Sequence, residues 1–354
     1  MEQVGRRVTI ADVAEKAGVS KTAVSFAFNN PDRLNTATAS RILDIAHELG
    51  YRPDPVARML TQRRTGAIGV LTPQDLSVIF TNPFFGAFSA GIAGVAEEHG
   101  YGLHFISPLH GSLTRAIHRA TVDGVVAIGL TDDHPEIHEI RRAGLPMVLV
   151  DSATSGELAS VDVDDEAGAA LAAEHLLELG HRDIAILAIE GPRDARHGEG
   201  NVVGRRLQGY RTALEAAGIS VNPDAVEVGP ATIAGGRAAF RRLWAAGRRP
   251  TGILAMSDAM AIGVIAELHD LGVAIPAEVS VVGFDDVDLA ASTNPPLTTV
   301  HQPVRGKGET AVRLLLAVIE GRDPSPGHRR LETRLVIRSS AGPVAADRRE
   351  VTAG

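Results

Sequence analysis

Apolar side chains in the first sixty residues recur three and four positions apart, which is the spacing of one face of an amphipathic helix. This spacing predicts three short helices, over residues 10–17, 21–28 and 36–49. Gly18 offers a stop for the first helix, and Ser20 offers an N-cap for the second. Two short helices joined by such a tight turn are typical of a helix-turn-helix, so we expect a small all-α module here.

After these helices the pattern becomes one of strands that alternate with helices. Runs such as residues 66–72 and 124–130 are apolar throughout, which indicates parallel strands covered on both faces. Helical spacing between the runs predicts helices over 84–99, 112–120, 136–143, 166–179, 202–217, 233–246 and 258–271. We therefore predict an α/β body of two doubly wound parallel sheets, with a ligand cleft at the carboxyl ends of the strands.

The charge of the chain divides at the same place as the pattern. The net charge is −8 over 354 residues, but residues 1–64 hold ten Lys or Arg against seven Asp or Glu, a balance of +3. The remaining residues hold twenty-five against thirty-six, a balance of −11. This asymmetry favours a small basic module that binds an acidic partner such as DNA, attached to an acidic body.

Composition excludes several classes of protein and site. The chain has no cysteine, which rules out disulfides, thiolate metal sites and cysteine nucleophiles. The first residues lack the apolar segment of a signal peptide, and no run of about twenty apolar residues could span a bilayer. We expect a cytoplasmic protein with no membrane partner.

The second predicted helix carries the side chains that favour DNA binding. Lys21, Thr22 and Ser25 point outward from it, and they are polar groups that can hydrogen-bond base edges and phosphates in a major groove. The alternative is a three-helix bundle in which these residues form only a solvated face.

An ordered run of residues strengthens the DNA interpretation. The sequence VTIADVAEKAGVSKTAVS at 8–25, Asn29 and LGYRPDPVARML at 49–60 resemble the DNA-binding headpiece of the LacI/GalR family of bacterial transcription regulators. The resemblance implies a recognition helix that carries Lys21, Thr22, Ala23 and Ser25. It also implies that four residues contact DNA phosphates or frame the recognition helix on the DNA backbone: Thr9, Ser20, Asn29 and Arg33.

One position of this motif departs from the family. An arginine that reads a base usually follows the V-S pair, whereas this chain has Phe26. A phenyl ring cannot donate hydrogen bonds to guanine, so Phe26 either contacts a thymine methyl group or packs inward. The operator should therefore differ from the family's usual sequence at this position.

Residues 53–64 read as a linker with one apolar stripe that includes Ala57 and Leu60. The resemblance implies a hinge helix that folds only on operator DNA and inserts Leu60 between base steps of the minor groove. Leu60 could instead only seal the contact between two hinge helices.

The resemblance extends over the body through HLLELGH, VSVVGFDD and PPLTTV. It implies the two-lobed fold of type I periplasmic binding proteins, with crossings between lobes near 160, 291 and 322. The expected division is a headpiece at 1–52, a first lobe at 65–160 and 292–322, a second lobe at 161–291 and 323–341, and a flexible tail at 342–354. Residues 303–321 would form a helix of the first lobe.

The candidate ligand residues lie where strands end. Asp151, Ser257 and Asp285 each follow an apolar run, and Arg206 lies in the first turns of a long helix. Carboxylates, a guanidinium and an aromatic ring, from Phe84 or Phe85, suit a polyhydroxylated ligand such as a sugar. Gln302 completes the predicted set. Plainer roles remain open: a turn or cap for Asp285, a surface ion pair for Arg206, a core position for the paired rings, and a solvated loop for residues 192–201.

No motif for catalysis, nucleotide binding or metal binding is present. The chain lacks GxSxG, GxxxxGK[ST] and HExxH, and His134 and His138 have no third ligand candidate. We therefore expect no cofactor, no metal and no enzymatic activity. The alternatives are a cytosolic solute-binding receptor and an α/β enzyme that carries a DNA-binding headpiece.

The sequence thus predicts a transcriptional regulator, a repressor in the first instance, that is a homodimer or a tetramer. A small molecule, expected to be a carbohydrate, would bind between the lobes and change the affinity for double-stranded operator DNA through linkage. The sequence does not distinguish an inducer from a co-repressor.

A twofold-symmetric dimer should select a near-palindromic site from random double-stranded DNA. Sequencing of the DNA retained by the purified full-length protein would measure this selection. Retention of no palindrome would rule out the predicted mode of recognition.

Overall fold

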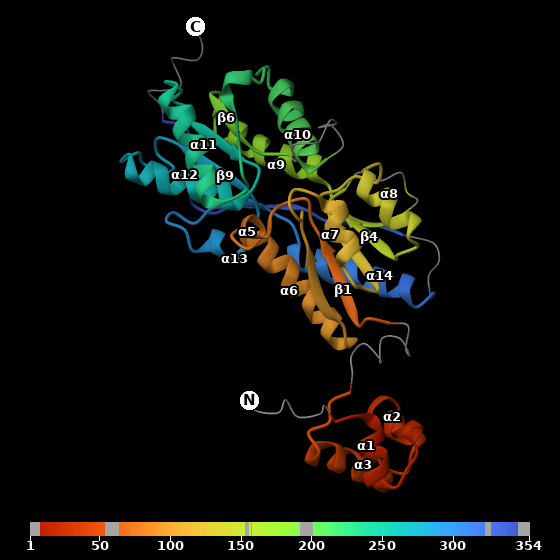
Figure 1. Cartoon of the computed structure of the whole chain (residues 1–354). Coiled ribbons are helices and arrows are strands. Elements are labelled where there is room, and N and C mark those ends of the chain that lie inside the picture. Colours follow the sequence, from red (N-terminus) through yellow and green to blue (C-terminus); the bar gives the residue numbers. More distant parts are fainter. Residues whose placement is uncertain are drawn as a thin grey trace. The chain divides into compact units, whose positions relative to one another are not determined.

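The computed structural model describes residues 8–53, 64–152, 156, 158–191, 201–322 and 327–345. The chain forms two compact units, Met1–Thr65 and Gly66–Gly354 (Figure 1). Ala57 and Leu60 lie outside the described residues, as do positions 192–200 of the predicted loop and the tail from residue 346.

The first unit has the predicted helix-turn-helix. Its helices are α1 (Ile10–Ala17), α2 (Lys21–Asn29), the 3₁₀ helix η1 (Pro31–Arg33) and α3 (Thr36–Glu48). Gly18 adopts a left-handed φ of 62° at the end of α1, and the N–H of Ala23 donates to the Ser20 hydroxyl, 3.1 Å away, at the start of α2. The predicted stop and cap are therefore both confirmed.

A small apolar core holds these helices together. Val13, Val24 and Ile42 are fully buried, one from each of the three α-helices. Phe28 packs edge-on against Tyr51, with ring centroids 5.7 Å apart, and so extends the core past the end of α3. The apolar core of this unit thus contains residues from all three helices.

The first lobe of the second unit is a parallel sheet with helices on both faces. Its strands are β1 (Ala67–Leu71), β2 (Gly102–Ile106), β3 (Gly124–Ile128), β4 (Met147–Val150), β5 (Ala159–Val163) and β11 (His328–Leu331), in the order β11-β5-β4-β3-β1-β2. Its helices are α5 (Leu76–Ile79), α6 (Pro83–Glu98), α7 (Leu113–Arg119), α8 (Pro135–Arg142) and α14 (Val304–Ile319). One apolar cluster joins the sheet to α6 and α14, and another joins it to α7 and α8.

The second lobe repeats this layered arrangement. Its strands are β6 (Ile184–Ile189), β7 (Val226–Gly229), β8 (Gly252–Ala255), β9 (Ser280–Asp285), β10 (Thr298–His301) and β12 (Arg334–Val336), in the order β12-β10-β9-β8-β6-β7. Its helices are α9 (Asp165–Glu178), α10 (Val202–Ala216), η2 (Pro223–Ala225), α11 (Ile233–Ala245), α12 (Asp258–Asp270) and α13 (Asp288–Ala291). The predicted two-sheet α/β fold is confirmed, except that β12 runs antiparallel to β10. None of the described helices is both long and apolar enough to cross a membrane.

The chain passes between the lobes three times. The first passage follows β5, close to the predicted position at 160. The predicted return near 291 is wrong, because β10 pairs with β9 and the chain stays in the second lobe up to His301. The predicted passage near 322 is also wrong, because β11 pairs with β5 of the first lobe before β12 joins the second. Local apolar patterns do not reveal which sheet a short strand joins, because pairing depends on the neighbouring strands and not on the strand's own sequence alone.

Helices α6 and α14 lie side by side in the first lobe, although two hundred residues separate them in sequence (Figure 1). Glycine makes their close approach possible, because a Cβ atom on Gly91 would lie 2.1 Å from the carbonyl oxygen of Arg305. A Cβ on Gly94 of the same helix would meet nothing within 4 Å. The packing of α6 against α14 thus requires glycine at position 91 but not at position 94.

Gly91→Ala should lower the free energy of unfolding by about 1–3 kcal/mol, because α14 must move away from α6. Gly94→Ala is the matched control, and it should stabilise by about 1 kcal/mol through helix propensity. Urea unfolding of both variants measures the difference, and equal effects would contradict the packing argument.

Candidate functional site

The polar groups predicted to meet DNA lie on and beside α2. Lys21 and Thr22 are exposed in its first turn, whereas Ala23 and Ser25 are half-buried. The Asn29 amide donates to the backbone carbonyl oxygen of Ser25, 3.1 Å away, which fixes this side chain at the end of the helix. The exposed first turn of α2 is therefore the part of the helix that offers free donors and acceptors.

Thr9, Ser20 and Arg33, the residues predicted to frame this helix on DNA, lie on neighbouring segments of the first unit. Thr9 and Ser20 are exposed N-cap residues of α1 and α2, and Arg33 is exposed on η1. Phe26 is half-buried, and the guanidinium carbon of Arg33 lies 5.4 Å from the centre of its ring. Phe26 is thus only partly buried, and the Arg33 guanidinium lies over its ring.

A cavity of about 1100 Å³ lies between the two lobes of the second unit. The carboxyl ends of β1, β3 and β4 line it from the first lobe, and those of β6, β8 and β9 line it from the second. Cavities of ~300–1,000 Å³ are typical of small-molecule sites, so this one could hold a ligand larger than a single sugar ring. Its position is the one that the two-sheet prediction gave.

Two aspartates at strand ends line this cavity, one from each lobe. Asp151 follows β4 with a φ of 54°, and Asp285 ends β9 with a φ of 132°. A positive φ is unusual for a residue other than glycine, and such backbone strain is found most often at functional sites. Asp285 is the last residue of β9 and lines the cavity, whereas its neighbour Asp286 pairs with Arg338 at 2.6 Å and with His301 at 2.9 Å.

Arg206 is the cation of the cavity and is almost completely buried. Its Nε donates to Asp165 Oδ1 at 2.9 Å, and its Nη1 donates to the carbonyl oxygen of Met256. Its guanidinium carbon stacks 3.6 Å from the centre of the Phe284 ring. The alternative of a surface ion pair for Arg206 is wrong, because only 3% of the residue is exposed.

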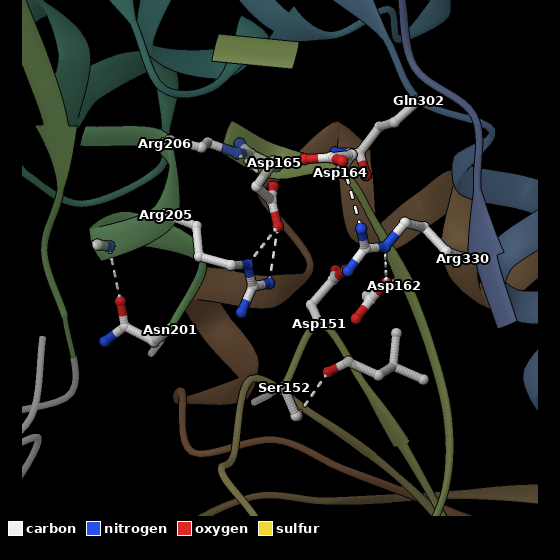
Figure 2. A network of polar contacts seen from close by, with 12 residues as sticks. Asp151, Ser152, Asp162, Asp164, Asp165, Asn201, Arg205, Arg206, Gln302 and Arg330 are labelled. Carbon is white, nitrogen blue, oxygen red and sulfur yellow. Dashed lines mark hydrogen bonds and ion pairs between the residues drawn. The ribbon is translucent and has the colours of Figure 1, made fainter. Parts of the chain in front are cut away.

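Asp165, the first residue of α9, accepts hydrogen bonds from both Arg205 and Arg206 of α10 (Figure 2). Burial by itself would raise the pKa of Asp165, but the two guanidinium groups outweigh it and the pKa is lowered. Asp165 is thus an ionised counterion for the wall of the cavity. On the adjoining segment, Arg330 reaches toward both Asp162 and Asp164 (Figure 2).

Burial raises the pKa of two carboxyl groups here, Asp285 in the wall of the cavity and Asp258 behind it. Burial raises the pKa of Asp285 to about 6, although Arg206 and Gln302 act in the opposite direction. Burial and the neighbouring charge of Asp285 raise the pKa of Asp258 to about 8. Asp258 is fully buried at the start of α12, where its Oδ1 lies 2.5 Å from the Thr299 hydroxyl and its Oδ2 accepts from the Val287 N–H. At neutral pH Asp258 is therefore mainly protonated.

The remaining predicted ligand residues occupy different positions. Ser257 lines the cavity and caps α12, with its hydroxyl 3.3 Å from the backbone nitrogen of Met260. Phe84 and Phe85 both line the cavity, but Phe85 belongs to the apolar core whereas Phe84 only packs against it. Gln302 does not line the cavity; it donates to Asp285 Oδ1 at 2.6 Å from the segment between the lobes.

Sequence reasoning missed Lys307, which is fully buried in the first turn of α14. Its Nζ lies 2.5 Å from Asp151 Oδ1 and 2.5 Å from Gln302 Oε1. The signal was present in the sequence, because Lys307 follows Val304 by three positions and precedes Ala311 by four. A lysine on the apolar face of a helix must find a buried acceptor.

His134 and His138, which the sequence places four residues apart, have different surroundings. His134 precedes α8 and lies 2.6 Å from Glu136, while His138 is exposed on the helix. Over the described ranges, no three His, Asp or Glu side chains come together as a group that could hold a metal ion.

Profiles of two known protein families match the chain, one in each structural unit. The family profile "Bacterial regulatory proteins, lacI family" matches residues 9–54, and the profile "Periplasmic binding protein-like domain" matches residues 173–341. The transcriptional regulator CelR of Thermobifida fusca is 33% identical over 95% of this chain and 98% of its own length. The transcriptional repressor CytR of Escherichia coli K12 is 33% identical over 94% of this chain and 96% of its own length.

Solved structures give the same result. A CelR–cellobiose complex is 31% identical, covers 95% of this chain and 100% of its own, and superimposes with a TM-score of 0.69. The lac repressor dimer bound to operator and the anti-inducer ONPF is 28% identical over the same shares, with a TM-score of 0.79. Both similarities span the headpiece segment and the two-lobed body.

The raised pKa of Asp258 makes the stability of the fold depend on pH. The unfolded chain loses this proton near the ordinary value of 3.8, whereas the folded chain keeps it up to about pH 8. The folded state therefore binds more protons in this window, and its stability falls as the pH rises.

Asp258→Asn imitates the protonated side chain and should remove this part of the pH dependence. The free energy of unfolding of the variant, relative to the wild type, should rise steadily between about pH 5 and pH 8. Urea unfolding across that range measures it. A difference that stays constant with pH would show that Asp258 is ionised throughout.

Proposed function

The chain belongs to the lacI family of bacterial regulatory proteins, and we propose that its operator affinity is set by an uncharged saccharide bound between the two lobes. It is a DNA-binding transcriptional regulator with the helix-turn-helix and effector-binding body of that family. The cavity of about 1100 Å³, with polar groups from both lobes, is the observation that carries the proposal.

Recognition of the operator rests on the exposed first turn of α2. Lys21 and Thr22 meet bases or phosphates in the major groove, with Ala23 and Ser25 beside them on the same helix. Phe26, flanked by Arg33, offers an apolar edge that suits a thymine methyl group. Thr9, Ser20 and Asn29 contact or frame the DNA backbone around the helix.

The operator in this proposal is near-palindromic and is bound by a homodimer. The lac repressor, which this chain resembles over its length, is a dimer on its operator. Residues 53–64 join the two units and serve as the hinge, with Ala57 and Leu60 toward the minor groove. Assembly into a tetramer would need contacts beyond these.

The effector occupies the cavity through hydrogen bonds and one aromatic contact. Asp151 and Asp285 accept from ligand hydroxyl groups, Arg206 donates, and the Phe84 ring lies against a C–H face of the sugar. The related regulator CelR has been solved with cellobiose, a molecule of this class. The size of the cavity favours a disaccharide or glycoside over a single ring.

The charges around the cavity argue against an anionic effector. Six carboxyl groups line it, from Asp132, Asp133, Glu136, Asp151, Glu190 and Asp285. Among the described residues that line the cavity, the cations are Arg206 and, when protonated, His134. Arg206 is already paired with Asp165, so the described part of the lining offers a sugar phosphate or sugar acid no unpaired arginine or lysine.

A purely regulatory role is favoured over the two rival functions. Relatives across the whole chain are transcriptional regulators, which supports a protein that is not an enzyme. The helix-turn-helix distinguishes the chain from a simple solute receptor. We accordingly place it in the cytoplasm, where its DNA is.

A thermal-shift screen of neutral saccharides against sugar phosphates and sugar acids tests the proposed effector class. A neutral saccharide should raise the unfolding temperature and should change operator affinity in a mobility-shift assay. Asp285→Asn should weaken binding of that saccharide by roughly tenfold to a hundredfold, the cost of about 1.5–3 kcal/mol for a hydrogen bond to a charged group.

Asp224→Asn is the matched control, because it removes a carboxylate on the exposed surface of the same lobe. It should leave saccharide affinity unchanged. Shifts produced only by anionic sugars would overturn the proposed class, and equal losses in both variants would place the binding site elsewhere.

A further inference from the structure

Lys307 is the only lysine after residue 21 in a chain with thirty-two arginines and three lysines. It is also fully buried, which is rare for a lysine unless it is paired. Arginine is the cation that this chain uses almost everywhere else. The presence of an ammonium group at this one buried position therefore needs a structural reason.

The contacts of Lys307 supply that reason. An ammonium group has three donors arranged around a point, whereas a guanidinium is a flat fork. Two oxygens lie 2.5 Å from Nζ, Oδ1 of Asp151 and Oε1 of Gln302. The ring of Phe84 lies 5.6 Å away, close enough for a cation–π contact. Only a compact cation fits between these three groups.

These contacts join the two lobes. Asp151 follows β4 of the first lobe, and Lys307 lies on α14 of the same lobe. Gln302 lies on the connection between lobes and donates its other end, Nε2, to Asp285 of the second lobe at 2.6 Å. The run Asp151–Lys307–Gln302–Asp285, here called the lobe bridge, is continuous from one sheet to the other.

Both ends of the lobe bridge are also walls of the cavity. Asp151, Asp285 and Phe84 line it, whereas Lys307 and Gln302 lie behind them. A ligand that hydrogen-bonds to either aspartate must share that carboxylate with Lys307 or Gln302. The occupancy of the cavity and the strength of the bridge are thus linked through the same atoms.

We propose that Lys307 is a positioning residue that fixes the ligand-free arrangement of the lobes, and that an effector acts by competing with the lobe bridge for Asp151 and Asp285. The first part concerns the chain alone. The second part rests on the proposed function, because it requires an effector in the cavity.

The absence of cysteine allows the lobe arrangement to be measured directly in the full-length protein. Arg119→Cys on α7 and Glu215→Cys on α10 give two exposed sites, one on each lobe, for spin labels. Double electron–electron resonance then reports the distance between lobes, with excess unlabelled chain added to suppress signals between protomers. No DNA and no effector are needed.

Lys307→Met should displace or broaden the distance distribution of the ligand-free protein. Arg305→Met is the matched control, because it removes an exposed cation from the same turn of α14 and should leave the distribution unchanged. A distribution for Lys307→Met that superimposes on the wild type would overturn the proposal.

The double variant Asp151→Asn/Lys307→Met separates positioning from damage by an unpaired buried charge. It lacks both charges, so it should fold even if Lys307→Met does not, and its distribution should remain displaced. A return to the wild-type distribution in the double variant would show that Lys307 only neutralises Asp151, and the proposal would fail. A negative saccharide screen would instead overturn the proposed function and leave the lobe bridge standing.

Discussion

Compensation of buried charge is the constraint on which the centre of this molecule depends. Asp165 neutralises Arg206, Asp151 neutralises Lys307, and Asp258 avoids ionisation by keeping its proton. A charged group removed from water is stable only with a partner, so each of these side chains fixes the position of another. Because the partners come from different elements, the same requirement shapes the wall of the cavity within each lobe. Gln302, which contacts both Lys307 and Asp285, links the charged pair of the first lobe to the second lobe.

The elements of the fold could be predicted well from the sequence, and their assembly only in part. Helices such as α6 and α10 have clear apolar stripes, and they begin and end close to the predicted positions. The strand β5 was missed, because Ser160 and Asp162 interrupt its apolar pattern although both are buried. The sheet that β11 joins depends on its pairing with β5, far earlier in the chain, which local spacing does not encode.

The candidate site could be predicted where a polar residue ends an apolar strand. This rule found Asp151, Ser257 and Asp285, all of which line the cavity. It could not find Lys307, whose importance depends on a partner about 150 residues earlier in the chain. Gln302 was also predicted to contact the ligand, but it does not line the cavity, and its amide donates to the Asp285 carboxylate.

The three passages between the lobes have a consequence for how the protein is made. The first sheet needs β11 and the helix α14, and the second needs β10 and β12, all of which come from residues 298–336. During synthesis neither lobe can finish its sheet until this last segment leaves the ribosome, although most of both lobes is already present. The effector-binding body should therefore reach its native state late and as one unit, while the headpiece, whose contacts lie within its own sixty residues, can fold long before.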